Sequence, residues 1–148
     1  MIGLFGGTFD PVHNGHLRAA LEVREALGLH EVRLVPTGRP PHRGMPHAAA
    51  AQRLAMLELA VAHQAGLVVD PRELRREGPS YSVLTLREVR AESGDAPVCL
   101  ILGRDAFAGL DRWWRWEEIL DLCHIAVVER RDGGAPLPDP VAALLEQR

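Results

Sequence analysis

Short apolar runs alternate along the chain with longer segments in which apolar residues recur every three or four positions. Continuous apolar runs of this length are typical of buried strands, and the periodic segments are typical of helices. The strand-like runs cover residues 1–5, 31–36, 67–70, 98–102 and 125–129. The helix-like segments cover residues 15–27, 48–64, 80 or 82 to about 93, 105–110, 116–122 and 140–147, and a polar stretch covers 71–79.

This alternation predicts an α/β fold, because strands that alternate with helices form a parallel sheet covered on both faces. At 148 residues the chain is expected to form one doubly wound, Rossmann-like domain that spans residues 1–148. Ligands of such open sheets bind beyond the carboxyl ends of the strands. We therefore expect residues 6–16, 37–43 and 103–105, which follow three of the strands, to line one crevice.

The basic residues restrict the chemistry, because all 17 are arginine and the chain has no lysine. A P-loop needs a lysine that contacts the phosphates, and a Schiff-base enzyme needs a lysine amine, so both classes are excluded. Phosphate groups would have to be held by arginine, histidine and backbone N–H groups. The formal charge of −3 argues against a general nucleic-acid binder.

The remaining composition points to a cytosolic protein without a membrane partner. Cys99 and Cys123 each lie in an apolar run, which favours two buried free thiols over a disulfide or a metal site. No apolar run approaches the ~20 residues that span a bilayer. The chain starts directly with a strand-like segment and lacks the basic region of a signal peptide.

Residues 6–16, which read Gly-Gly-Thr-Phe-Asp-Pro-Val-His-Asn-Gly-His, carry the most informative pattern. Two glycines after a strand let the backbone approach a ligand closely. His13 and His16 are three residues apart where a helix begins, so their rings can lie on the same side. The helix N-terminus adds free N–H groups and a positive partial charge. Together these features suit the negative charge that develops on a polyphosphate during phosphoryl or nucleotidyl transfer.

Simpler interpretations exist for the same residues. Gly6-Gly7 is also what a tight turn requires. His13 and His16 could be zinc ligands, although no cysteine or acidic pair completes a set. The stretch is not the G-x-G-x-x-G fingerprint, which makes a nicotinamide-dependent dehydrogenase a weak alternative.

The stretch resembles the H-x-G-H signature of the nucleotidyltransferase superfamily, and all eleven residues are similar to those of nicotinate-nucleotide adenylyltransferases. Three further blocks resemble that family in the same order. They are Pro-Pro-His-Arg at 40–43, Pro-Ser-Tyr-Ser at 79–82 with Thr-Leu at 85–86, and Gly-Arg-Asp at 103–105 followed by Trp-Trp at 113–114. The resemblance covers residues 2 to about 130.

The resemblance implies a doubly wound fold, ATP and Mg²⁺ as cofactors with the metal carried by ATP, and attack of a mononucleotide phosphate on the α-phosphorus. It implies that His13 and His16 are catalytic and stabilise the ATP phosphates. Six residues would bind ATP and its phosphates: Gly7, Thr8, Phe9, Arg43, Gly103 and Asp105. Three residues would bind nicotinate mononucleotide: Thr85, Trp113, which would stack on the pyridine, and Trp114.

Several of these side chains also have a structural interpretation. Trp116 is expected to anchor the core rather than bind a ligand. Asp105 could be a helix N-cap, and Tyr81 could serve packing alone. The arginines of 72–76 are expected to form a solvated polar segment.

The chain departs from the family pattern at its end. The family continues with a further strand and an Ile-Ser-Ser/Thr-x-x-Arg motif that contributes to adenine and phosphate binding, and this motif does not occur here. The resemblance therefore implies that the C-terminal part of the family fold is missing, either by truncation or in a naturally shortened relative. The alternatives to a nicotinate-nucleotide enzyme are a phosphopantetheine adenylyltransferase, which usually has threonine where His13 stands, and a nucleotide-binding module without catalysis. Small molecules are the expected partners, and a homo-oligomer is left open.

Overall fold

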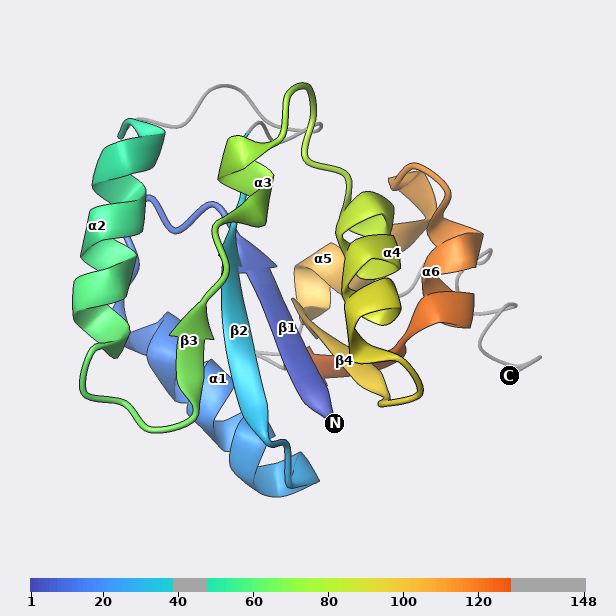
Figure 1. Cartoon of the computed structure of the whole chain (residues 1–148), viewed down its shortest axis with the longest axis horizontal. Coiled ribbons are helices and arrows are strands. Elements are labelled where there is room, and N and C mark those ends of the chain that lie inside the picture. The colour runs from blue at the N-terminus through green and yellow to red at the C-terminus, as the bar shows by residue number, and fades with distance from the viewer. Residues whose placement is uncertain (39–47, 129–148) are drawn as a thin grey trace.

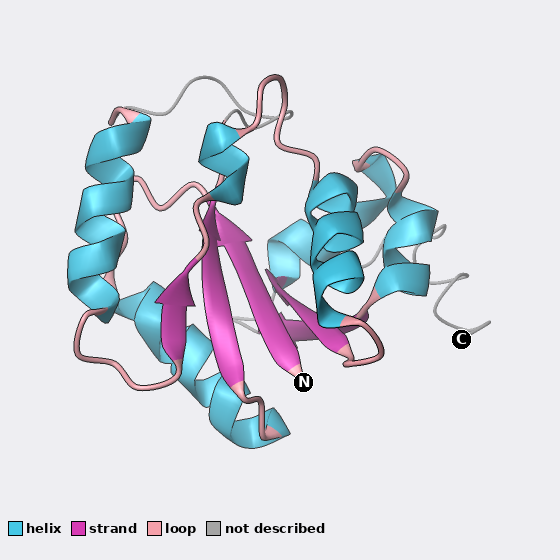
Figure 2. Cartoon of the chain, in the orientation of Figure 1, coloured by secondary structure: helices cyan, strands magenta, loops and turns pink. Residues whose placement is uncertain are grey.

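The computed structural model describes residues 1–38 and 48–128. They form a parallel five-stranded sheet with helices on both sides (Figures 1 and 2). The strands are β1 (Ile2–Gly7), β2 (Glu31–Pro36), β3 (Leu67–Val69), β4 (Val98–Gly103) and β5 (His124–Val128). The helices are α1 (Asn14–Leu27), α2 (Ala50–Val61), α3 (Arg72–Arg75), α4 (Ser82–Ser93), α5 (Arg104–Ala108), the 3₁₀ turn η1 (Leu110–Arg112) and α6 (Trp116–Leu122).

The strand order β3-β2-β1-β4-β5 puts β1 at the centre of the sheet. Its Phe5 lies opposite Leu34 of β2 on one side and Ile101 of β4 on the other. The chain winds outward from β1 to β3 and then returns to the centre, where β4 is added on the opposite side of β1. The winding direction therefore reverses between β1 and β4, which is where a doubly wound sheet opens a crevice at its carboxyl edge.

Alternate side chains of the strands enter two separate cores. Leu4 and Leu100 point to the face that α4 and α6 cover, together with buried residues such as Leu86. Phe5 and Ile101 point to the other face, which α1 and α2 cover. Figure 1 shows the two pairs of helices on opposite sides of the strands. Continuous apolar strands are needed because both faces of the sheet are buried.

The predicted fold class and strand positions are confirmed. The helix expected over 48–64 begins at Ala50 and ends at Val61. The stretch 71–79 contains the single-turn helix α3, which was not predicted. The helix expected over 140–147 lies outside the described residues.

The described part of the chain also tests three smaller expectations. Cys99 and Cys123 are both free thiols, the first buried and the second half-buried. Trp116 packs against the core on the α4 and α6 side, as expected of an anchor. Among the described helices, none has the length and apolar character that a membrane span needs.

Candidate active site

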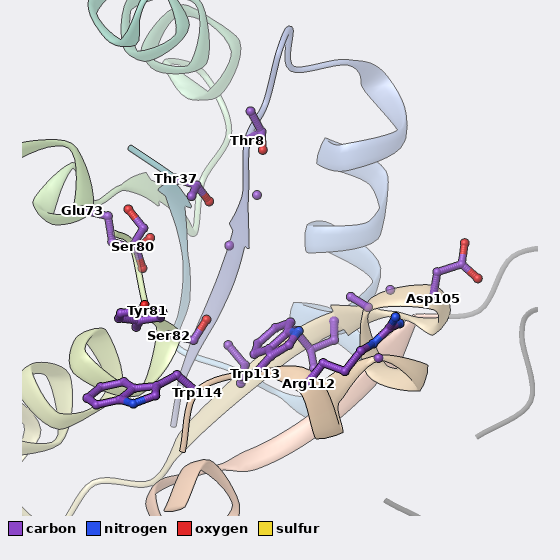
Figure 3. A pocket seen from close by; sticks show the side chains of 17 residues that line it. Thr8, Thr37, Glu73, Ser80, Tyr81, Ser82, Asp105, Arg112, Trp113 and Trp114 are labelled. Carbon is purple, nitrogen blue, oxygen red and sulfur yellow. The ribbon is translucent and has the colours of Figure 1, made fainter. Parts of the chain in front are cut away.

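A cavity of about 490 Å³ opens at the carboxyl ends of β1, β2 and β4 (Figure 3). Its walls come from the loop after β1, the end of β2, the segment before α4, and the segment from α5 to the tryptophans. Six of the residues predicted to bind substrates line it: Gly7, Thr8, Gly103, Asp105, Trp113 and Trp114. Residues of both sets, those predicted for ATP and those predicted for the mononucleotide, thus contribute to one cavity.

His13 and His16, the residues predicted to be catalytic, do not line this cavity. They lie at the start of α1, as its N-cap and N3 residues. The Nδ1 atom of His13 accepts a hydrogen bond from the Gly15 N–H, and the Nδ1 atom of His16 accepts one from the His13 N–H, each at 3.1 Å. The two rings stack with their centroids 3.7 Å apart. A Cβ on Gly15 would lie 2.9 Å from the His13 ring, so the glycine of the motif makes room for this stack.

These hydrogen bonds determine which ring atoms can reach a ligand. Because both Nδ1 atoms accept from backbone N–H groups, the network assigns the ring hydrogen of a neutral imidazole to Nε2. Burial, and secondarily the charge of His13, lowers the pKa of His16 to about 4. His16 is therefore a neutral Nε2–H donor at pH 7 in the free protein.

Phe9 packs against the His16 ring and does not line the cavity. Its ring is buried and meets the His16 ring edge-on with the centroids 5.0 Å apart. The backbone of Phe9 is left-handed, with φ 49°. A Cβ on Gly7 would lie 3.3 Å from the Phe9 ring, which limits that position to a small residue.

Thr85 is buried beneath the cavity and lines a small adjoining one. Its hydroxyl donates to a carboxylate oxygen of Glu73 at 2.6 Å and accepts from Arg76 at 3.2 Å. These bonds occupy the hydroxyl within the protein. Any contact between Thr85 and a ligand would therefore have to come from its backbone.

Glu73 is a buried carboxylate in the cavity wall, and no pattern in the sequence indicated it. Burial raises its pKa, although hydrogen bonds from Thr85 and Ser80 oppose the shift. The Ser80 Oγ also accepts from the Gly38 N–H at 3.0 Å. Glu73 and Ser80 thereby attach the segment before α4 to the end of β2, and they form one wall of the cavity.

An aromatic group forms a further part of the cavity lining. Trp113 lines the cavity and also packs against the core. Trp114 is 43% exposed, and its ring lies 4.9 Å from the ring of Tyr81. Tyr81 both lines the cavity and packs against the core, so packing alone does not describe it.

Arg112 is a cation in the cavity that the sequence analysis did not single out. It lies between Trp113 and Asp105 in Figure 3. Its guanidinium approaches Gly109, where a Cβ would be 2.9 Å from Nη2. Among the described residues, the Arg112 side chain has no hydrogen-bond or ion-pair partner, which leaves it able to bind an anion. Its place between the two cavity-lining blocks at 103–105 and 113–114 was a signal that could have identified it.

Gly103 is the N-cap of α5 and Asp105 lies in the first turn, so the N-cap interpretation of Asp105 is wrong. Arg43 lies outside the described residues. Within residues 1–38 and 48–128, no group of three or more histidine, cysteine and acidic residues could hold a metal ion.

A buried arginine, Arg53, is the third residue that the sequence analysis missed. Arg53, Leu57 and Val61 are spaced four residues apart and form the buried face of α2. This spacing was the signal in the sequence, because it places an arginine on the apolar face of a helix. A buried arginine requires hydrogen-bond or charged partners.

Known proteins with similar sequences identify the family to which the chain belongs. The profile of the cytidylyltransferase-like family matches residues 4–147. A protein of Pseudomonas fluorescens named "Probable nicotinate-nucleotide adenylyltransferase" is 56% identical over 148 residues, which are 99% of this chain and 69% of that protein. A protein of Pseudomonas aeruginosa with the same name is 54% identical over the same shares. This chain belongs to the nicotinate-nucleotide adenylyltransferase family.

Solved structures agree with the fold of the family. The nicotinic acid mononucleotide adenylyltransferase of Plasmodium falciparum, solved in complex with NaAD, superposes with a TM-score of 0.80 at 14% identity. The match covers 97% of this chain and 70% of that one. The same enzyme in complex with APC gives a TM-score of 0.74. At this identity the likeness supports the doubly wound fold and no more.

Proposed function

We propose that this chain transfers the AMP part of ATP to nicotinate mononucleotide and releases pyrophosphate. The observation that carries the proposal is the 56% identity to a nicotinate-nucleotide adenylyltransferase, because it extends over 99% of the chain and includes the segments that build the cavity. The product is nicotinate adenine dinucleotide, a step in NAD biosynthesis. A cytosolic site of action is part of the proposal.

The chemistry is a direct displacement at phosphorus. An oxygen of the mononucleotide phosphate attacks the α-phosphorus of ATP and forms the new P–O–P bond. The bond from the α-phosphorus to the oxygen that bridges to the β-phosphate breaks, and pyrophosphate leaves with the electron pair. No residue of the protein becomes covalently attached, so catalysis depends on positioning and on stabilising the charge of the transition state.

The residues predicted to bind phosphate and ribose suit these requirements. His13 and His16 would donate from Nε2 to the phosphate oxygens, in the positive field of the N-terminus of α1. Gly7 and Thr8 would bring their backbone to the phosphates, and Arg43 would add positive charge. Gly103 and Asp105 would hold the adenosine ribose.

At the other end of the cavity, Trp113 would stack on the pyridine ring. Backbone N–H groups near Thr85 and Trp114 would bind the nicotinate carboxylate, which an amide in its place would meet unfavourably. An unpaired buried polar group costs about 1–3 kcal/mol, so we propose a preference of roughly tenfold or more for nicotinate over nicotinamide.

We also propose that Mg²⁺ arrives with ATP as part of the substrate. The phosphate oxygens of ATP would supply its ligands, with water completing the coordination. When bound, the ion would neutralise charge on the leaving pyrophosphate.

The test is to incubate the protein with ATP, Mg²⁺ and nicotinate mononucleotide, and to measure pyrophosphate and the dinucleotide by mass spectrometry. Parallel reactions contain nicotinamide mononucleotide or phosphopantetheine. Formation of nicotinate adenine dinucleotide supports the proposal. Turnover of phosphopantetheine alone would assign the sister activity, and binding of nucleotides without any product would indicate a non-catalytic module.

A further inference from the structure

The guanidinium of Arg53 is buried, and its described partners are backbone carbonyl oxygens. The side chain is 2% exposed. Its Nη1 donates to the Thr8 carbonyl at 2.9 Å and to the Thr37 carbonyl at 2.8 Å, and its Nε donates to the Ala48 carbonyl at 3.2 Å. Thr8 follows β1, Thr37 follows β2, and Ala48 precedes α2. One side chain therefore fastens together the chain segments at the carboxyl edge of two neighbouring strands.

The hydrogen bonds also orient the peptide groups to which the carbonyls belong. A trans peptide is planar, and its N–H points opposite to its C=O. For the Thr37–Gly38 peptide, the C=O meets Arg53 and the N–H donates to Ser80, so the peptide is held at both ends. Arg53 holds the Thr8–Phe9 peptide in the same way at its C=O. The Phe9 N–H therefore points away from Arg53, and it has no partner among the described residues.

This peptide lies where phosphate would be bound. Thr8 lines the cavity, and the left-handed Phe9 follows it with φ 49°. A non-glycine residue keeps a conformation in that region only where surrounding contacts hold it. The bond from Arg53 to the Thr8 carbonyl is one such contact. The same side chain places its positive charge behind the loop, where the nearby Asp10 carboxylate offsets part of that charge.

We infer that Arg53 is a positioning residue for adenylyl transfer, which holds the Thr8–Phe9 peptide so that its N–H meets the phosphates of ATP. The inference rests on the proposed function for the identity of the phosphates. It adds a residue of α2 that contacts no substrate and acts through the loop. A residue with a merely structural role would affect stability and both substrates together, whereas Arg53 should affect ATP selectively.

The test compares Arg53→Met with Arg90→Met. Arg90 is a suitable control because it is half-buried and also donates to a backbone carbonyl, that of Ala96 at 3.2 Å, but it lies in the last turn of α4 and does not line the cavity. Each variant is assayed below its own melting temperature. We expect Arg53→Met to lower kcat/KM for ATP about 100-fold, the scale of one lost preorganised donor, with the KM for nicotinate mononucleotide within about threefold of wild type. Arg90→Met should leave kcat/KM for ATP within about threefold.

Arg53→Lys keeps the charge but cannot reach all three carbonyls with a single ammonium group. We expect it to fold and to lose about tenfold in kcat/KM for ATP, between wild type and Arg53→Met. If Arg53→Met does not fold, this variant decides the question. Wild-type kinetics in Arg53→Lys, or an equal rise in the KM values of both substrates in Arg53→Met, would overturn the inference.

Binding measurements separate this inference from the proposed function. ATP binding is measured by calorimetry for wild type, Arg53→Lys and Arg90→Met, without any second substrate. We expect ATP affinity to fall about tenfold in Arg53→Lys alone. This result is informative even if the wild-type protein gives no dinucleotide product. Equal ATP affinity in all three proteins would refute the role of Arg53.

Discussion

His16 is held by a backbone hydrogen bond and two aromatic neighbours, so its Nε2–H is preorganised toward a ligand. We expect His16→Ala to lower kcat by about 100- to 1000-fold, corresponding to about 2.7–4 kcal/mol for one donor to developing charge. The Kd for nicotinate mononucleotide should change little. Steady-state kinetics and calorimetry together check this. An unchanged kcat would remove His16 from the mechanism.

The low pKa of His16 predicts a pH dependence of stability. The pKa is about 4 in the folded protein and 6.5 for an unperturbed histidine. Between these values the unfolded chain binds more protons, so this group stabilises the fold fully above about pH 6.5 and progressively less as the pH falls toward 4. Urea unfolding at pH 7 and pH 5 should show a smaller loss of stability in His16→Ala than in wild type. Identical losses in the two proteins would contradict this.

Arg112 predicts how an anion is bound. Its guanidinium lies on the Asp105 side of Trp113 (Figure 3), toward the residues proposed for the adenosine ribose. We therefore expect it to pair with a nucleotide phosphate, which nicotinate and nicotinamide mononucleotides share. Arg112→Gln should lower kcat/KM for both by about tenfold and leave their ratio unchanged, since a charged hydrogen bond contributes about 1.5–3 kcal/mol. Arg87→Gln, which breaks a surface pair with Glu118, is the control.

The opposite outcome would also be informative. If Arg112→Gln impaired only nicotinate mononucleotide, Arg112 would bind the carboxylate. Specificity would then not depend on backbone N–H groups near Thr85 and Trp114.

Residue patterns predicted the parts of the site that are local in sequence. Residues 6–16 show their chemistry because strand, turn and helix start follow one another there. Glu73 could not be predicted, because its hydrogen-bond partners Thr85 and Ser80 become neighbours only after folding. Thr85 was found by resemblance, but its hydroxyl contacts Glu73, which no pattern in a single sequence indicates.

At the scale of elements, the start of α1 makes structure and catalysis interdependent. His13 and His16 are the N-cap and N3 residues of α1 and also the proposed phosphate donors. Gly15 leaves space for the His13 ring, which lies 2.9 Å from where a Cβ would be. Alanine favours a helix over glycine by about 1 kcal/mol, so Gly15→Ala is expected to combine roughly unchanged stability with displaced imidazoles.

We therefore expect Gly15→Ala to lower kcat at least about tenfold with a melting temperature near that of wild type. Asn14→Ala, one residue earlier on the exposed turn, should retain kcat within about twofold. Parallel thermal melts and kinetics measure both quantities. A Gly15→Ala protein with wild-type kcat would show that the ring stack is not needed.

Elements with strong local signals were predicted closely, and the others depend on distant partners. The end of α1 was predicted because Gly28 adopts the left-handed conformation that closes a helix, with φ 63°. The single turn α3 has too few residues to show a period. It is held by Arg72, which bonds Asp70 before the turn and Glu92 on α4. The arginines expected to be solvated are thus partly engaged in ion pairs.

At the scale of the whole molecule, two cores lie on opposite faces of one sheet. Leu57 is fully buried on the α1 and α2 side, and Leu86 is 1% exposed on the α4 and α6 side. Each substitution to alanine should lower the free energy of unfolding by about 2–5 kcal/mol. Because the sheet separates the two sites, the double variant should show the sum of the two effects within about 0.5 kcal/mol.

Urea unfolding checks these values, and Leu59→Ala is the matched control. Leu59 is on the same helix as Leu57 but 78% exposed, so its truncation should change stability by less than about 0.5 kcal/mol. A double variant far from the sum would indicate that the two cores are coupled through the strands.

All three tryptophans lie in one region of the molecule, which includes part of the cavity and the neighbouring core. Trp113 lines the cavity, Trp114 lies at its exposed edge, and Trp116 packs into the core on the α4 and α6 side. The intrinsic fluorescence of this protein therefore originates at one place. Excitation of tryptophan reports on that place alone, so emission can follow ligand arrival without an added dye. Tryptophan emission does not report on changes at β3 or α2, because neither element contains a tryptophan.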